Sequence, residues 1–352
     1  MKKILILGSR GMLGQELVLA FSLSCKGNVG PAPRVPARSF LAEGGSSSLS
    51  VSDEGVVGWD KEDLDVTNFP LLEEKIAALK PSVIINATAY NDVDVCEKSD
   101  EEYQKALKLN RDVPGKLAEI VAKIGAILVH YSTDYVFGGD GDAVGVGTGA
   151  HIGAPLRGYD ETAPPSPLSR YGQSKWEGEK VLALAFVETR HGASLQTANM
   201  SSGFYLIRLS RLFGRPAGSG KKSFFVKMLE LSQTQEELKA VNDEVGCFTY
   251  APDLAKATKK LIEEKYPFGI YHLPNEGEAS WYDGVVELFN LSHPVGAGFK
   301  PAPTPGVILI TPVPASTFPR PARRPSYSAL ANTKFPKLRH YHDALAEFLE
   351  QL

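Results

Sequence analysis

A tyrosine and a lysine four residues apart, Tyr171 and Lys175, are the strongest candidates for chemistry in this chain of 352 residues. At that spacing both side chains lie on one face of a helix. A lysine ammonium group beside a phenol favours the phenolate, so we expect Lys175 to lower the pKa of Tyr171 from about 10 toward neutrality. Tyr171 would then act as a general acid–base on a substrate oxygen. The same spacing also occurs by chance on exposed helices, so its context decides its meaning.

A hydroxyl group at a predicted strand end supplies part of that context. The apolar run 126–131 is followed by Ser132, Thr133 and Asp134. Thr133 could polarise the same substrate oxygen that Tyr171 protonates. The order threonine, tyrosine, lysine behind a glycine-rich turn indicates a catalytic group.

That turn contains Gly8, Gly11 and Gly14, which follow the apolar run 3–7 and open an amphipathic segment. Such glycines permit a tight turn, let a pyrophosphate approach the backbone and allow a helix to pack on a sheet. The spacing is GxxGxxG, whereas many dehydrogenases have GxGxxG, so a purely structural turn is the alternative. The pattern predicts a dinucleotide site.

Acidic residues after the second predicted strand, 56–59, bear on the choice of cofactor. Asp60 is placed to accept a hydrogen bond from a ribose hydroxyl, which favours NADH. Arg10 and Lys61 could instead bind the 2′-phosphate of NADPH, so both cofactors stay open. Asp65 is a candidate for the adenine amino group or, equally, for a cap of the helix that follows.

Strand–helix alternation must position these residues. It predicts an α/β fold with a Rossmann-like, doubly wound parallel sheet and a smaller, mixed α/β C-terminal substrate domain. We expect an NAD(P)-binding domain over 1–214, and a second part over 215–352 that returns strands to the core. The predicted strands are 3–7, 56–59, 82–87, 126–131 and 204–209, and the predicted helices are 69–80, 99–124, one from about 171 and one within 338–352.

Composition limits the remaining classes of function. The 33 glycines and 24 prolines exceed average usage and concentrate in 26–54, 138–158 and 294–325, of which the first two are predicted loop insertions. A net charge of −3 disfavours a broad nucleic-acid partner surface, and no apolar run suits a membrane span. Three scattered cysteines fit a reducing compartment. We expect a cytoplasmic protein with no nucleic-acid or membrane partner.

Taken together, the motifs resemble the extended short-chain dehydrogenase/reductase superfamily and, within it, the dTDP-4-dehydrorhamnose reductase family. The resemblance implies hydride transfer from NADPH or NADH to the 4-keto carbon of dTDP-4-dehydro-L-rhamnose, a small-molecule dTDP-sugar, to give dTDP-L-rhamnose. The segments that carry it are ILGSRGMLGQEL, WDKEDLDVTN, VIINATAYNDVDVCE, HYSTDYVFGG, SRYGQSKWEGEK, VNDEVGCFTYAPDLA and ARRPSYSALANTKF.

The resemblance also implies residue roles. Tyr171 is the implied proton donor, Lys175 orients the nicotinamide ribose, and Thr133 binds the sugar ketone. The other implied substrate residues are Asp134, Arg211 and Arg324. The implied cofactor-binding residues are Gly8, Gly11, Met12, Leu13, Gly14, Asp60, Asp65, Val66, Ala89, Tyr90, Asn91, Tyr131 and Lys175.

Some positions depart from the family pattern. Arg211 stands where the family commonly has tryptophan, and Glu244 and Phe248 stand where glutamine and proline are usual. Glu16 matches a glutamate that binds magnesium at a dimer interface in some members, which makes Mg²⁺ and a homodimer candidates. An exposed helix charge is the alternative for Glu16.

Two other classes of function stay open. An epimerase or 4,6-dehydratase shares the fold, but dehydratases resemble this chain with a second carboxylate where Tyr135 stands. A non-catalytic cofactor-binding subunit, such as the regulatory subunit of methionine adenosyltransferase, keeps the tyrosine–lysine pair. Thr133 and the segment from Arg324 favour the reductase. Insertions at 26–54 and 138–158 could block the site, but their composition predicts that activity is retained.

Overall fold

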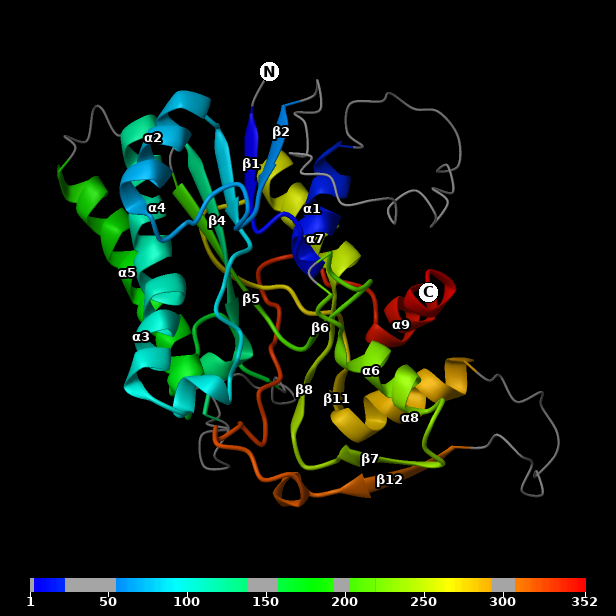
Figure 1. Ribbon diagram of the computed structural model, residues 1–352. Coiled ribbons are helices and arrows are strands. Elements are labelled where there is room, and N and C mark those ends of the chain that lie inside the picture. Colours follow the sequence, from blue (N-terminus) through cyan, green and yellow to red (C-terminus); the bar gives the residue numbers. More distant parts are fainter. Residues whose placement is uncertain (1–2, 23–54, 139–157, 193–202, 219, 293–307) are drawn as a thin grey trace, which may run out of the picture.

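The computed structural model describes residues 3–22, 55–138, 158–192, 203–218, 220–292 and 308–352. Its centre is a six-stranded sheet in the order β10-β5-β4-β3-β1-β2, in which every neighbouring pair is parallel (Figure 1). The predicted doubly wound parallel sheet is confirmed. The strands are β1 (Ile4–Leu7), β2 (Val56–Trp59), β3 (Val83–Asn86), β4 (Ile127–Thr133), β5 (Gly203–Leu209) and β10 (Gly269–His272).

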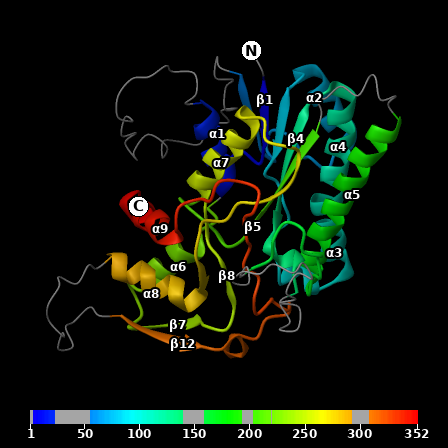
Figure 2. The same cartoon turned by 180° about the vertical axis from the view of Figure 1, so that it is seen from behind.

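Helices cover both faces of the sheet (Figures 1 and 2). One face packs against α1 (Met12–Ser22) and α7 (Ala251–Glu263), and the other against α2 (Phe69–Leu79), α4 (Val113–Ile124) and α5 (Arg170–Gly192). Alternate strand residues point to opposite cores, as Ile6 does toward the first face and Leu5 toward the second. This two-sided burial explains why the strands are continuous apolar runs without alternation. Among the described residues, no helix is long and apolar enough to cross a membrane.

The helix predicted over 99–124 is interrupted by a wider turn. It divides into α3 (Asp100–Leu107), a π-helical turn (Lys108–Asp112) and α4, and the Val113 amide donates to the carbonyl of Lys108. Pro114 explains the interruption, because it has no amide hydrogen for the carbonyl of Asn110 and its ring crowds that carbonyl. The Asn110 carbonyl instead faces α5, where a Cβ on Gly178 would lie 2.0 Å from its oxygen.

The C-terminal part contains short paired strands around an aromatic core. β6 pairs with β9 and β7 with β12 in parallel, while β8 and β11 are antiparallel. Phe213, Phe225, Phe248, Tyr250 and Phe348 are buried together between these strands and three helices. The elements are β6 (Leu212–Phe213), α6 (Phe224–Leu231), β7 (Glu237–Val241), β8 (Val245–Cys247), β9 (Thr249–Tyr250), β11 (Glu278–Ser280), α8 (Trp281–Ser292), β12 (Leu309–Val313) and α9 (Tyr341–Glu350).

The two parts of the chain interleave. Both α7 and β10 come from beyond residue 215, yet they pack on the parallel sheet. The predicted domain boundary at residue 214 stays a prediction, and segments from beyond it pack on the sheet of the first part. The predicted insertion 26–54 lies outside the described residues, as does 138–158 except for Gly138 and Gly158.

Replacing Gly178 with alanine should destabilise the contact between α5 and the π-helical turn. The added Cβ would lie 2.0 Å from the Asn110 carbonyl oxygen, so the two backbones must separate. We expect the free energy of unfolding to fall by about 1–3 kcal/mol, measured by urea denaturation. Gly218→Ala is the control, because there the nearest atom would be 3.6 Å away. Equal losses in both variants would contradict the proposed clash.

Candidate active site

The glycine-rich turn lies where the strand order reverses. From β1 the chain moves outward to β2 and then returns across β1 to β3, and parallel sheets bind ligands at the carboxyl ends of such strands. Gly8 follows β1 with φ of +77°, and a Cβ there would lie 3.0 Å from the carbonyl of Ala87, which follows β3. A Cβ on Gly14 would lie 2.0 Å from the Gly8 oxygen. Met12 and Leu13 begin α1, whose first-turn amides point toward this turn.

The turn leaves room and donors for a pyrophosphate. The buried hydroxyl of Ser9 has no hydrogen-bond partner among the described residues. Together with the helix N-terminus, this hydroxyl fits an anionic group that the chain itself does not supply. The glycine-rich turn is therefore suited to the pyrophosphate of a dinucleotide.

Asp60 holds this turn against the end of β2. Its carboxylate accepts the backbone amides of Arg10 (2.9 Å) and Lys61 (2.8 Å). The guanidinium group of Arg10 donates to Glu62 at 3.1 Å. Asp60 therefore lies beside the turn and stabilises it by accepting these two amides. Its bond to ribose stays a prediction.

Asp65 closes a local turn before α2. Its carboxylate accepts the amide (2.9 Å) and hydroxyl (2.8 Å) of Thr67, and these bonds lower its pKa. The N-cap of α2 is Asn68, so Asp65 is not the cap considered as its alternative role. Val66 is buried in the core beneath α2.

The segment after β3 is fixed by Asn110, which the sequence analysis missed. The Asn110 side chain accepts the Tyr90 amide (2.9 Å) and donates to the Tyr90 carbonyl (3.0 Å) and to Ser174 (2.9 Å). This connects Ala89, Tyr90 and Asn91 to α5. Pro114 signals the free backbone carbonyl of Asn110 but not this role of its side chain, for which the sequence carries no local signal.

The predicted catalytic residues converge at the end of β4. Tyr171 and Lys175 on α5 are buried, as is Thr133 at the strand end. The Tyr171 phenol interacts with the Thr133 hydroxyl and reaches the Asn91 side chain at 3.5 Å. The structure therefore brings together one hydroxyl from the sheet and one phenol from the helix.

Lys175 is buried one turn after Tyr171 on α5. Its ammonium group donates to the backbone carbonyl of Tyr131 at 2.7 Å. The phenol of Tyr131 instead shares a hydrogen bond with Thr258 (2.8 Å) beneath α7. If Tyr131 contributes to the cofactor path, as predicted, the described contacts favour its backbone over its side chain.

The expected lowering of the Tyr171 pKa is wrong for this structure. Burial raises the pKa of Tyr171 above its usual range, although the hydrogen bond to Thr133 opposes the shift. Burial also lowers the pKa of Lys175 to about 8, and the charge of Glu179 opposes that shift. At neutral pH Tyr171 is thus a protonated acid beside a charged lysine.

Asp134 links three distant segments. Its carboxylate accepts hydrogen bonds from Thr133 (3.1 Å), Ser210 (2.7 Å) and Ser328 (2.6 Å). Burial raises its pKa, while the hydroxyl bonds oppose the rise. The predicted contact between Asp134 and sugar stays a prediction, whereas its contacts within the chain orient Thr133.

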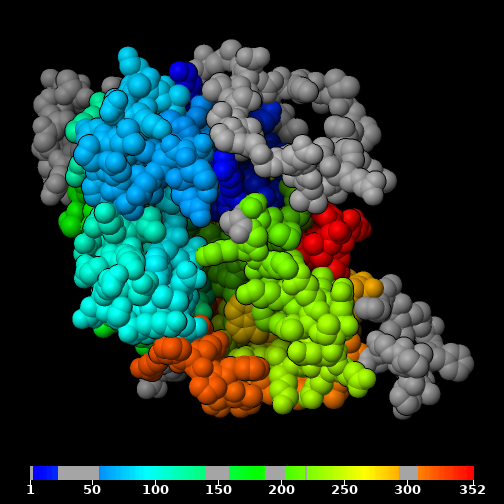
Figure 3. Space-filling model, viewed as in Figure 1, coloured from blue at the N-terminus to red at the C-terminus, as the bar shows by residue number. Residues whose placement is uncertain are grey.

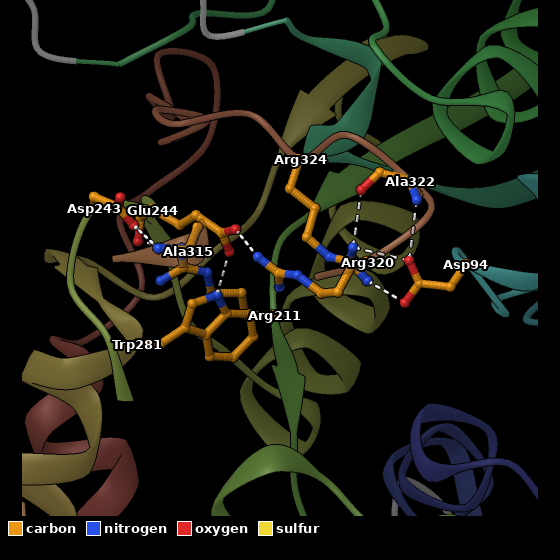
Figure 4. A network of polar contacts seen from close by, with 9 residues as sticks. All are labelled: Asp94, Arg211, Asp243, Glu244, Trp281, Ala315, Arg320, Ala322 and Arg324. Atoms are coloured by element: carbon orange, nitrogen blue, oxygen red, sulfur yellow. Dashed lines mark hydrogen bonds and ion pairs between the residues drawn. The ribbon is translucent and has the colours of Figure 1, made fainter. Parts of the chain in front are cut away.

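The other predicted substrate residues belong to a polar network between the two parts (Figure 4). Arg211 has φ of +44° and donates to the carbonyls of Ala279 (2.7 Å) and Glu244 (2.8 Å). Arg324 makes a two-point ion pair with Asp94 at 3.0 and 2.7 Å. Arg211 and Glu244, which both depart from the family pattern, therefore lie in contact.

A hollow opens on one face of the molecule. Figure 3 shows it between the cyan N-terminal helices and the green C-terminal part, with the orange segment after β12 along its lower edge. The network continues from that segment through Arg320, which the sequence analysis also missed and which forms an ion pair with the Glu244 carboxylate.

Glu16, the candidate metal ligand, is neither exposed nor in a cluster of acids. It is buried on α1 and accepts two hydrogen bonds from Arg215, at 3.1 and 2.7 Å. Across the described ranges, no group of three or more His, Cys, Asp or Glu side chains could hold a metal ion. A paired arginine disfavours a cation at this carboxylate, so the donor set does not fit Mg²⁺ here.

Known proteins resemble this chain in both sequence and fold. The family model described as RmlD substrate binding domain matches residues 41–352. The dTDP-4-dehydrorhamnose reductase of Burkholderia thailandensis is 30% identical over 338 residues, covering 94% of this chain and 90% of that protein.

Two solved structures have the same architecture. A dTDP-4-dehydrorhamnose reductase from Clostridium acetobutylicum has a TM-score of 0.73 at 30% identity and covers 99% of both chains. The Bacillus anthracis enzyme of that name, solved in complex with NADP, has a TM-score of 0.73 at 25% identity and covers 100% of both chains. The chain therefore belongs to the dTDP-4-dehydrorhamnose reductase family.

Proposed function

We propose that this protein reduces the 4-keto group of dTDP-4-dehydro-L-rhamnose with NADPH or NADH, giving dTDP-L-rhamnose for carbohydrate biosynthesis. The observation that carries the proposal is the convergence of the Tyr171 phenol and the Thr133 hydroxyl, with Lys175 buried one turn after Tyr171 on α5. These groups suit the protonation of an alkoxide at one point. The family to which the chain belongs supports the choice of substrate.

The cofactor would be held at the carboxyl ends of β1 and β3. Gly8 and Gly14 let the turn pack closely on Ala87 and on the start of α1, Ser9 has a hydroxyl without a partner among the described residues, and Asp60 holds the turn from the end of β2. When bound, the reduced nicotinamide supplies the hydride. Arg10 and Lys61 lie close enough to Asp60 to serve a 2′-phosphate, so NADPH and NADH are both proposed.

Side chains of the protein bind and protonate the oxygen of the ketone. The Thr133 hydroxyl donates its one hydrogen to Asp134 in this structure, so it would turn from that carboxylate to donate to the ketone oxygen. Tyr171 carries the proton that the developing alkoxide takes, because burial raises its pKa. The ammonium group of Lys175, which donates to the Tyr131 carbonyl, would add positive charge on the side of α5 that carries Tyr171.

The two alternatives receive less support. A 4,6-dehydratase needs a carboxylate where Tyr135 stands, and the Tyr135 ring instead packs edge-on against Tyr171 at 5.6 Å. A non-catalytic binding subunit keeps the tyrosine–lysine pair, so the family to which the chain belongs, and not that pair, favours the reductase. Relatives that match nearly the whole chain include proteins named dTDP-4-dehydrorhamnose reductase.

We also propose a cytoplasmic location and a homodimer. The location is supported by the scattered, buried cysteines Cys96 and Cys247, which are free thiols in the structure. The homodimer is supported by the family resemblance alone. Sedimentation velocity of the purified protein tests it, and a single species of monomer mass would contradict it.

Purified protein should oxidise NADPH or NADH only when dTDP-4-dehydro-L-rhamnose is present. The measurement is the loss of reduced-nicotinamide absorbance with enzymatically prepared substrate. No oxidation with either cofactor would refute the proposed function.

Tyr171→Phe should lower kcat by about 10²–10⁴-fold, because it removes the proton donor and leaves the ring. Affinity for NADPH, measured by fluorescence titration, should stay near that of the wild type. Tyr205→Phe is the matched control, since that buried phenol donates to the carbonyl of Tyr266 within the sheet core. A fully active Tyr171→Phe would reject the assigned acid.

Lys175→Met should reveal the cost of burying the ammonium group. The pKa of Lys175 is about 8 when folded against 10.5 as the reference value, so between these pH values the unfolded chain binds more protons. Raising the pH therefore favours the folded wild type at this residue. From about pH 7 to about pH 9.5, we expect the wild type to gain about 1–2 kcal/mol relative to Lys175→Met in urea unfolding. A difference that does not change with pH would contradict this assignment.

A further inference from the structure

Three guanidinium groups form a row between the two parts of the molecule, and we call Arg211, Arg320 and Arg324 the arginine row (Figure 4). Arg324 is neutralised by its two-point pair with Asp94. The other two share one carboxylate, because Glu244 pairs with Arg320 while Arg211 donates only to neutral carbonyls. Within its own contacts, the row thus has three cations and two anions.

The nearest other carboxylate does not complete the row. Asp134 acts on Arg211 through its charge, but no ion pair joins them within the described residues. The oxygens of Asp134 accept hydroxyl groups of Thr133, Ser210 and Ser328 instead. Arg211 is half-buried, and a guanidinium group shielded from water without an ion-pair partner is unfavourable unless another anion compensates it.

The two arginines keep donors free and are held in place. A guanidinium group has five N–H donors. Among the described contacts, Arg320 uses one nitrogen, toward Glu244, and Arg211 uses two. The Trp281 ring lies 4.2 Å from the Arg211 guanidinium carbon and donates its own N–H to Glu244 at 3.1 Å. The left-handed backbone of Arg211 is a strained conformation of the kind that persists at binding sites.

The row begins next to the reacting groups. Ser210, which precedes Arg211, is bonded to the same Asp134 carboxylate that holds Thr133. Tyr135, whose ring contacts Tyr171, feels the charges of both Arg211 and Arg324. In a nucleotide sugar the diphosphate is attached to C1, which lies across the ring from the C4 ketone. A diphosphate site is therefore required about one sugar ring away from Tyr171 and Thr133.

We propose that Arg211 and Arg320 bind the diphosphate of the nucleotide sugar, and that the Glu244 carboxylate holds Arg320 in position when no ligand is bound. The inference deepens the proposed function and rests on it for the sugar nucleotide. Glu244 is almost completely buried while the Arg320 side chain is 25% exposed, so the arginine is the more accessible partner for a ligand. A bound diphosphate shares Arg320 with Glu244 and is repelled by its negative charge.

Calorimetric titration of the full-length protein with dTDP, thymidine and inorganic pyrophosphate tests this site. Arg320→Met should weaken dTDP binding and raise KM for the dTDP-sugar by about 10–100-fold, with kcat near the wild-type value. Thymidine, which has no phosphate, should bind both proteins equally. Pyrophosphate should displace dTDP from the wild type but should no longer displace it from Arg320→Met.

Glu244→Gln should change dTDP affinity in the opposite direction to Arg320→Met, and a misfolded variant would not bind dTDP more tightly. Removing the competing charge should tighten dTDP binding several-fold. Arg339→Met is the control, because that arginine pairs with Asp253 and Glu347 away from the site and should leave dTDP affinity unchanged.

The outcomes separate this inference from the proposed reaction. Unchanged dTDP affinity in Arg320→Met, or weaker binding in Glu244→Gln, would overturn the diphosphate site even if the wild type is an active reductase. A wild type that binds dTDP through Arg320 yet reduces no ketosugar would support the site and refute the reaction.

Discussion

One buried carboxylate, Asp134, joins the segments from which the site is built. It lies directly after Thr133 at the end of β4 and accepts hydroxyl groups from Ser210, just after β5, and from Ser328 near the C-terminus. Hydroxyl donors satisfy the carboxylate without adding a second charge, which suits a position shielded from water. The direction of the Thr133 hydroxyl, the path after β5 and the docking of the C-terminal segment all depend on this carboxylate.

A second buried group supports α5 in the same region. Arg208 on β5 makes a two-point ion pair with Glu179, at 3.0 and 2.6 Å, and meets the ring of His272 at 3.2 Å. Burial lowers the pKa of His272 to about 3, so this imidazole is neutral and can accept from Arg208. Glu179 lies one turn after Lys175, so the helix that presents the catalytic pair is attached to the sheet by charge as well as by apolar packing.

Local patterns were sufficient for much of this description. The strands β1 to β5, the glycine-rich turn and the tyrosine–lysine pair follow from apolar runs and fixed spacing, and the structure brings Thr133, Tyr171 and Lys175 together. Long-range contacts could not be predicted in this way. Ser328 reaches Asp134 across nearly two hundred residues, and Arg320 stands in a proline-rich segment with no regular period. The predicted lowering of the Tyr171 pKa was wrong, because residue spacing reveals a neighbouring charge but not the degree of burial.

The position of β10 has a consequence for how the protein is made. A ribosome releases the first five strands of the sheet before the chain passes through the aromatic core of the C-terminal part and returns for the sixth. Until residues 269–272 emerge, β5 is an open edge, and until α7 emerges one face of the sheet is covered by α1 alone. The sheet therefore cannot be completed until the chain has been made as far as residue 272, well into the C-terminal part, and a nascent chain released earlier would expose an unpaired strand and part of an apolar face.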